Sequence, residues 1–105
     1  MQQTTTKTTY TKLEAELICT EAILIYHRMS KIMLPFDITA AICKELNISR
    51  KHLWVDFAID NKGEYYVEVK FYNPIIDIIM KETSINPHIV QSRINYLKSK
   101  LNATT

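Results

Sequence analysis

The sequence has little glycine, little cysteine and no long apolar run, and each scarcity narrows the class of protein. No apolar stretch reaches the roughly 18 residues that a membrane-spanning helix needs. The start, MQQTTTKTTYTK, has a lysine but no apolar segment after it, so it does not resemble a signal peptide. We therefore expect an intracellular, cytoplasmic protein with no membrane partner.

The two cysteines also argue against two kinds of site. Cys19 and Cys43 both lie in apolar helical patterns and lack the spacing of metal ligands. Cysteines placed in this way are more often buried small apolar residues than members of a disulfide or a zinc site. We expect both to be buried in helices.

Size and charge set further bounds. The chain has 105 residues, of which 47% are hydrophobic and 23% charged, which indicates one globular domain near the lower end of self-sufficient size. The net charge of +2 is too small to indicate nucleic-acid binding by itself. Any basic surface would have to be local.

The order of the apolar patterns predicts an α+β fold. An N-terminal helix, a short second helix, a central antiparallel β-hairpin and C-terminal helices follow one another along the chain. Residues 1–9 and 102–105 are polar and have nothing to bury. We expect them to be a flexible lead and a flexible tail around a single domain at residues 10–101.

The N-terminal half predicts two helices. Apolar residues recur at helical spacing over residues 10–29, and the predicted inward stripe is Leu13, Leu17, Ile18, Leu24 and Ile25. The segment KIMLP, residues 31–35, predicts a short strand that Pro35 stops. Asp37 is the predicted N-cap of a second helix that ends near Asn47.

The C-terminal part contains one ambiguous segment and one clear helix. Residues 75–85 carry apolar side chains on nearly every face, so a buried helix and a buried strand both remain open. Asn86 and Pro87 predict the cap and first turn of a last helix that runs to about Leu101. Its predicted inward stripe is Val90, Ile94, Leu97 and Leu101.

The hairpin over residues 52–72 can be assigned a register. A two-residue loop would mix apolar and polar faces, because a slip by one residue inverts every side chain. A three-residue loop at residues 61–63, with Gly63 in the left-handed conformation, brings the apolar faces together. That register places Asp56 directly opposite Glu68 on the other face.

This polar face is the candidate site. Like charges directly opposite each other are destabilising unless positive charge lies between them. A divalent cation such as Mg²⁺ or Mn²⁺, held by Asp56 and Glu68, would supply it. Lys70, on the same face, would orient an attacking water or stabilise charge on a phosphate. The alternative is an ordinary solvent-exposed face of an antiparallel sheet.

Glu21 is the third acid of interest. It lies within the apolar stripe of the first helix, where a carboxylate is costly to bury without a partner. It either joins the site of Asp56 and Glu68 or reaches the rim and pairs with a lysine.

A leading helix with Glu21, a strand with Asp56 and a following strand with the motif EVK at residues 68–70 together resemble the PD-(D/E)XK nuclease superfamily. The resemblance covers residues 10–72. It implies Mg²⁺-dependent phosphodiester hydrolysis of nucleic acid, with DNA as the expected partner. Asp56 and Glu68 would then hold the metal, Lys70 would assist the attacking water, and Glu21 would support the metal or its waters. A homodimer is expected, because such nucleases often cut two strands.

Two other functions fit the same sequence. A winged-helix protein would use residues 37–72, with Arg50 and Lys51 on a recognition helix and Lys62 at the tip of the hairpin, all contacting DNA. A small interaction protein from a virus or mobile element would need no catalysis. It would dimerise through the hairpin edge or the last helix.

Overall fold

The computed structural model describes residues 9–32 and 35–103 and confirms the α+β class. Its elements are α1 (Lys12–Met29), α2 (Pro35–Leu46), β1 (Leu53–Ile59), β2 (Tyr65–Tyr72), β3 (Asp77–Glu82) and α3 (Pro87–Ala103). The strands form one antiparallel sheet in the order β1-β2-β3. None of the helices in these residues is long and apolar enough to cross a membrane.

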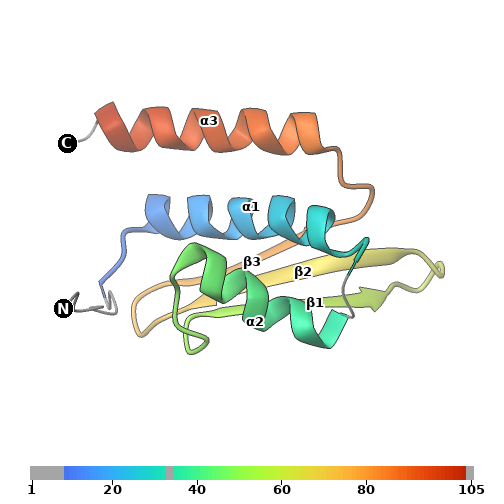
Figure 1. Cartoon of the computed structure of the whole chain (residues 1–105). Helices are drawn as coiled ribbons and strands as arrows, with labels where there is room; N and C mark the ends of the chain where they lie inside the picture. Colours follow the sequence, from blue (N-terminus) through green and yellow to red (C-terminus); the bar gives the residue numbers. More distant parts are fainter. Residues whose placement is uncertain (1–8, 33–34, 104–105) are drawn as a thin grey trace.

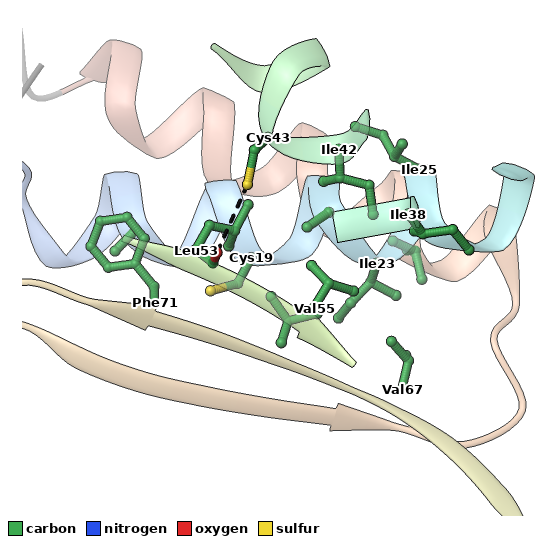
Figure 2. Packing of buried hydrophobic residues seen from close by; sticks show 14 of the residues in the cluster. Cys19, Ile23, Ile25, Ile38, Ile42, Cys43, Leu53, Val55, Val67 and Phe71 are labelled. Atoms are coloured by element: carbon green, nitrogen blue, oxygen red, sulfur yellow. Dashed lines mark hydrogen bonds between the residues drawn. The ribbon is translucent and has the colours of Figure 1, made fainter. Parts of the chain in front are cut away.

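The helices gather on one side of the sheet (Figure 1). α1 contacts β2 and β3, α2 contacts β1, and α3 packs on α1. α1 is therefore a middle layer between the sheet and α3. The side chains buried between the sheet and the helices include Cys19, Ile23, Ile38, Ile42, Leu53, Val55, Val67 and Phe71 (Figure 2). We call this covered side of the sheet the inner face and the opposite side the outer face.

Because α1 lies between two layers, it has two apolar sides. Small residues face the core, and Ala15, Cys19 and Ala22 are fully buried. The predicted stripe is therefore only partly right: Leu17 and Leu24 are half-buried and lie toward α2 and α3. Periodicity alone favoured large residues, whereas the buried side of α1 combines small residues with Ile23 and Ile25.

The start of α1 is defined by a capping box. The Thr11 hydroxyl accepts a hydrogen bond from Glu14 N at 3.0 Å, and the Glu14 carboxylate accepts one from Thr11 N at 2.9 Å. The helix therefore begins at Lys12, two residues later than predicted. Tyr10 instead packs its ring edge-on against Phe71, with 5.0 Å between ring centroids.

The segment before α2 differs from the prediction. α2 begins at Pro35, where proline suits a first helical turn, so Asp37 lies inside the helix and its assignment as N-cap is wrong. Lys31 and Ile32 form a turn rather than a strand. The remainder of the predicted strand, residues 33–34, lies outside the described residues.

The end of α2 agrees with the prediction. Asn47 adopts a left-handed conformation with φ 55°, directly after the last helical residue. Ile48 N then donates to Cys43 O at 2.9 Å, and Asn47 N donates to Lys44 O at 3.2 Å. These two bonds satisfy carbonyls that the helix end would otherwise leave free.

The hairpin has the predicted loop and register. Gly63 has φ 83°, and β1 pairs with β2 so that Val55 lies opposite Val69 and Asp56 opposite Glu68. The loop is also closed by Asp60, whose carboxylate accepts from the backbone N of Lys62 and of Glu64 at 2.8 and 2.9 Å. An aspartate that bonds the backbone two residues ahead is a common turn device.

The ambiguous segment forms a strand. A tight turn precedes β3, in which the Asn73 side chain accepts from Ile75 N and Ile76 N at 2.9 and 2.7 Å. β3 then pairs with β2 and directs Ile78 and Met80 toward the inner face. The strand alternative is therefore right, but β3 is an edge strand whose alternate side chains are exposed, not a buried strand.

α3 begins as predicted, at Pro87. The Asn86 side chain accepts from His88 N and Ile89 N at 3.0 and 3.3 Å, which caps the helix. Of the predicted stripe, Val90, Ile94 and Leu97 are buried and Leu101 is half-buried. The helix continues to Ala103, so it includes two residues that were assigned to the tail.

Both cysteines are free and buried, as predicted. Burial, and to a smaller extent the Glu16 carboxylate, raises the pKa of Cys19 to about 12. Burial also raises the pKa of Cys43, whose thiol donates to Leu53 O over 3.8 Å. Both thiols are therefore neutral, weakly reactive core groups at physiological pH.

The edge of β1 that does not pair with β2 receives hydrogen bonds from α2. The buried Thr39 hydroxyl donates to Val55 O. Two residues along the same edge, the Cys43 thiol donates to Leu53 O, which Figure 2 marks with a dashed line. Edge carbonyls that are buried without a donor are unfavourable. α2 is thereby fixed beside the sheet, and this edge of β1 is covered.

We expect Thr39→Val to lower the free energy of unfolding by about 1–3 kcal/mol, because it leaves the Val55 carbonyl buried without its donor. Thr39→Ser keeps the hydroxyl and should lose less than half as much. Urea titration followed by circular dichroism measures both variants. Equal losses in the two variants would show that packing of the methyl group, not the hydrogen bond, is what matters.

Candidate functional site

The outer face brings three of the predicted site residues together. Asp56 on β1 is directly opposite Glu68 on β2, and Lys70 is directly opposite Trp54 in the next row of the same face. The sheet therefore has the pairing that the candidate site required. No described helix covers these residues.

The positive charge beside Glu68 comes from lysines. Lys70 Nζ lies 3.6 Å from Glu68 Oε1, and Lys81 Nζ lies 3.7 Å from Glu68 Oε2. Lys81 is on β3, directly opposite Glu68, and its Nζ also lies 5.6 Å from the centroid of the Tyr66 ring. The repulsion between opposed carboxylates is thus relieved by neighbouring lysines on both sides of Glu68.

The two carboxylates do not share a partner. Asp56 Oδ1 accepts from Phe57 N at 2.8 Å, on the edge of β1 that does not pair with β2, whereas Glu68 is directed at its lysines. Each acid is therefore satisfied separately. A divalent cation between them would compete with two lysines for the Glu68 carboxylate.

Glu21 lies elsewhere. It is on α1, above the inner face, and its Oε2 is 3.8 Å from Lys98 Nζ of α3. It lines a hollow of about 210 Å³ that also includes Glu45 and Gln91. The sheet therefore separates Glu21 from Asp56, and the pairing with a lysine is the alternative that the structure supports.

The environment of Glu21 affects its ionisation. Burial raises the pKa of its carboxyl group above the usual 4.5, and Lys98 opposes this only in part. A raised pKa means that the folded state favours the neutral acid. The carboxylate form of Glu21 is therefore less favoured in the folded protein than in the unfolded chain.

The three predicted DNA-contacting residues lie at opposite ends of β1. Arg50 and Lys51 lie in the turn before β1, and Lys62 lies in the loop after it, so the length of the strand separates them. At about 3.3 Å per residue this is on the order of 20 Å or more. The chain forms a turn and a strand where the winged-helix hypothesis needs a recognition helix.

Sequence reasoning missed Ile79 and Lys81, which β3 adds to the outer face. Trp54, Lys70 and Ile79 lie side by side across the three strands, and Trp54 and Ile79 are 51% and 55% exposed. Tyr72, 57% exposed, is in the next row opposite Asp77. Ile79 and Lys81 occupy alternate positions of the segment DIIMKE, and this spacing becomes informative only once the segment is known to be a strand.

The described residues contain no cluster of three or more histidine, cysteine, aspartate or glutamate side chains that could hold a metal ion. Searches against protein-family models, curated proteins and solved structures gave no match. By its architecture, the chain is a small α+β protein with an antiparallel sheet covered on one face.

We expect Glu21→Gln to be more stable than the parent protein at pH 7. Because the folded pKa is raised, the contribution of Glu21 is most favourable below pH 4.5 and is lost as pH rises through the folded pKa. The amide imitates the neutral acid, so the advantage should vanish below pH 4.5. Urea titrations at pH 7 and pH 4 measure this difference.

Two further variants control for the substitution. Glu64→Gln removes an exposed carboxylate on the hairpin and should change little at either pH. Lys98→Gln leaves Glu21 without its cation and should destabilise the protein at pH 7. A less stable Glu21→Gln at pH 7 would show that the ion pair outweighs burial.

Proposed function

We propose that this chain is a small interaction protein that acts by binding a second copy of itself and has no catalytic role. The observation that carries the proposal is where the exposed apolar side chains lie. Five of the nine large exposed hydrophobic residues in the described part are in the strands: Trp54, Ile59, Tyr65, Tyr72 and Ile79. Three of them, Trp54, Tyr72 and Ile79, lie on the outer face, and exposed apolar side chains grouped on one face are typical of an interaction surface.

The sheet is least complete at β3. Val69 and Phe71 of β2 are fully buried on the inner face, whereas their β3 neighbours Met80 and Ile78 are only half-buried. Ile75, in the turn before β3, is 90% exposed. A chain of this size gains from burying further apolar surface by association.

The charges on the outer face also favour assembly over hydrolysis. Glu68 is held by two lysines, and Glu21 lies on the other side of the sheet. Together with Asp56 and Asp77, the face carries acids and lysines in similar numbers. A mixed face of this kind suits a protein surface better than a phosphate backbone.

We expect the protein to form a homodimer with a Kd in the range of about 1 μM to 1 mM, as is typical of a small interface. Sedimentation equilibrium over a wide range of protein concentration would show the mass rising toward that of two chains. A single-chain mass at every concentration would contradict the proposal.

The second candidate is Mg²⁺-dependent phosphodiester hydrolysis of DNA by Asp56, Glu68 and Lys70. The specific observation in its favour is the cross-strand pairing of Asp56 with Glu68, with Lys70 on the same face. A bound Mg²⁺ or Mn²⁺ would supply Lewis-acid activation of a water or phosphate. The lysines that now hold Glu68 would remain close enough to stabilise a phosphate.

The hydrolytic candidate predicts cleavage of branched, duplex or single-stranded DNA that requires Mg²⁺ or Mn²⁺. Asp56→Asn and Glu68→Gln should each abolish it, and Glu64→Gln on the same hairpin should not. Activity that persists in both site variants would exclude these residues. DNA binding without cleavage, lost on replacing Arg50 and Lys51 by alanine, would instead favour a nucleic-acid-binding role.

A further inference from the structure

The backbone of β3 has a free edge. Asn73 N donates to Ile76 O, which fixes the alternation of hydrogen bonds between β2 and β3. The hydrogen-bonded pairs are therefore Phe71 with Ile78 and Val69 with Met80. The alternate residues of β3 therefore point their N–H and C=O groups away from β2. These residues are Asp77, Ile79 and Lys81, and no hydrogen bond within the described residues satisfies their backbone groups.

The side chains at this edge are self-complementary. Asp77, Ile79 and Lys81 lie on the outer face, with an isoleucine midway between opposite charges. In an antiparallel pair formed by two copies about a two-fold axis at Ile79, Asp77 lies opposite the partner's Lys81. Ile79 lies opposite the partner's Ile79, and Ile78 lies opposite the partner's Met80 on the inner face.

We propose that the free edge of β3 binds the same edge of a second copy, antiparallel and centred on Ile79, and joins the two sheets into one of six strands. The inference rests on the proposed self-association and specifies its interface. The outward-pointing backbone groups of Asp77, Ile79 and Lys81 then become a continuous ladder.

Charge selects this register among the alternatives. If the two-fold axis passed through Ile78 or Met80 instead, Ile79 would lie opposite the partner's Asp77 or the partner's Lys81, and the charge pairs would be lost. Moving the axis by two residues sets Asp77 against the partner's Asp77, or Lys81 against the partner's Lys81, and like charges directly opposite are unfavourable. Only the centre at Ile79 pairs opposite charges twice, because an interface with two-fold symmetry repeats each contact.

The pairing also uses contacts already present in one chain. Lys81 lies between Glu68 and the edge, so it would bridge Glu68 and the partner's Asp77. On the inner face, Ile78 and Met80 are half-buried, and the partner strand would cover their exposed sides. The row of Trp54, Lys70 and Ile79 would continue across the axis into the same row of the partner.

A pair of charge reversals tests the register. The variant Asp77→Lys has lysine at positions 77 and 81, and Lys81→Asp has aspartate at both. A dimer of either variant alone would therefore place like charges opposite each other at two places. Each should weaken self-association about tenfold or more. An equimolar mixture should form a heterodimer, because every lysine then faces an aspartate. Sedimentation equilibrium and native mass spectrometry would measure these species, and circular dichroism would check that each variant folds.

Matched reversals at exposed positions away from the edge are the controls. Glu64→Lys on the hairpin and Lys44→Asp on α2 should leave self-association unchanged. Unchanged dimerisation of Asp77→Lys, or a mixture that stays monomeric, would overturn the β3 interface while self-association itself could stand. A monomeric parent protein would overturn both.

A cross-link provides an independent test. Ile79→Cys places two thiols beside the two-fold axis, with Cα atoms about 5.5 Å apart, and a short bifunctional maleimide should join them in high yield. Ile75→Cys is at least as exposed, but its two copies would be on the order of 27 Å apart and should not be joined. The buried Cys19 and Cys43 contribute little background. Equal yields from the two variants would contradict the proposed register.

Discussion

The loop at residues 61–63 sets the register of β1 against β2, and the remainder of the sheet follows from it. Gly63 adopts a positive φ that other residues reach only with strain, and the Asp60 carboxylate closes the same turn. With this register, Val55 and Val69 face the helices while Asp56 and Glu68 face outward. A slip by one residue would have exposed the core and buried the charges.

The position of α1 decides what those outward charges can do. Because α1 lies between the sheet and α3, Glu21 is directed to Lys98 and not to the outer face. In the resemblance to a PD-(D/E)XK nuclease, Glu21 would support a metal held by Asp56 and Glu68. The sheet brings Asp56, Glu68 and Lys70 together on the outer face, whereas Glu21 lies on the other side of the sheet.

In the self-association that we propose, the outer face and the β3 edge act together as one surface. Lys81 relieves the repulsion that Glu68 and Asp56 would otherwise create, and it lies at the edge where the strand ladder is incomplete. An open edge invites pairing with another chain, and natural sheets usually cover it or place charges there. Here α2 covers the edge of β1 through Thr39, whereas β3 carries an aspartate and a lysine that match a second copy.

The sequence by itself determined the hairpin, its loop, its register and the cap of α3, because these depend on contacts between near neighbours and on side-chain alternation. It also placed Asp56, Glu68 and Lys70 on one face. It could not determine the direction of Glu21, since α1 has two apolar sides and only packing decides which faces α3. Nor could it identify β3, or Lys81 as the partner of Glu68. An apolar segment becomes a strand where a neighbouring strand offers its hydrogen bonds, and that neighbour is supplied by the tertiary structure.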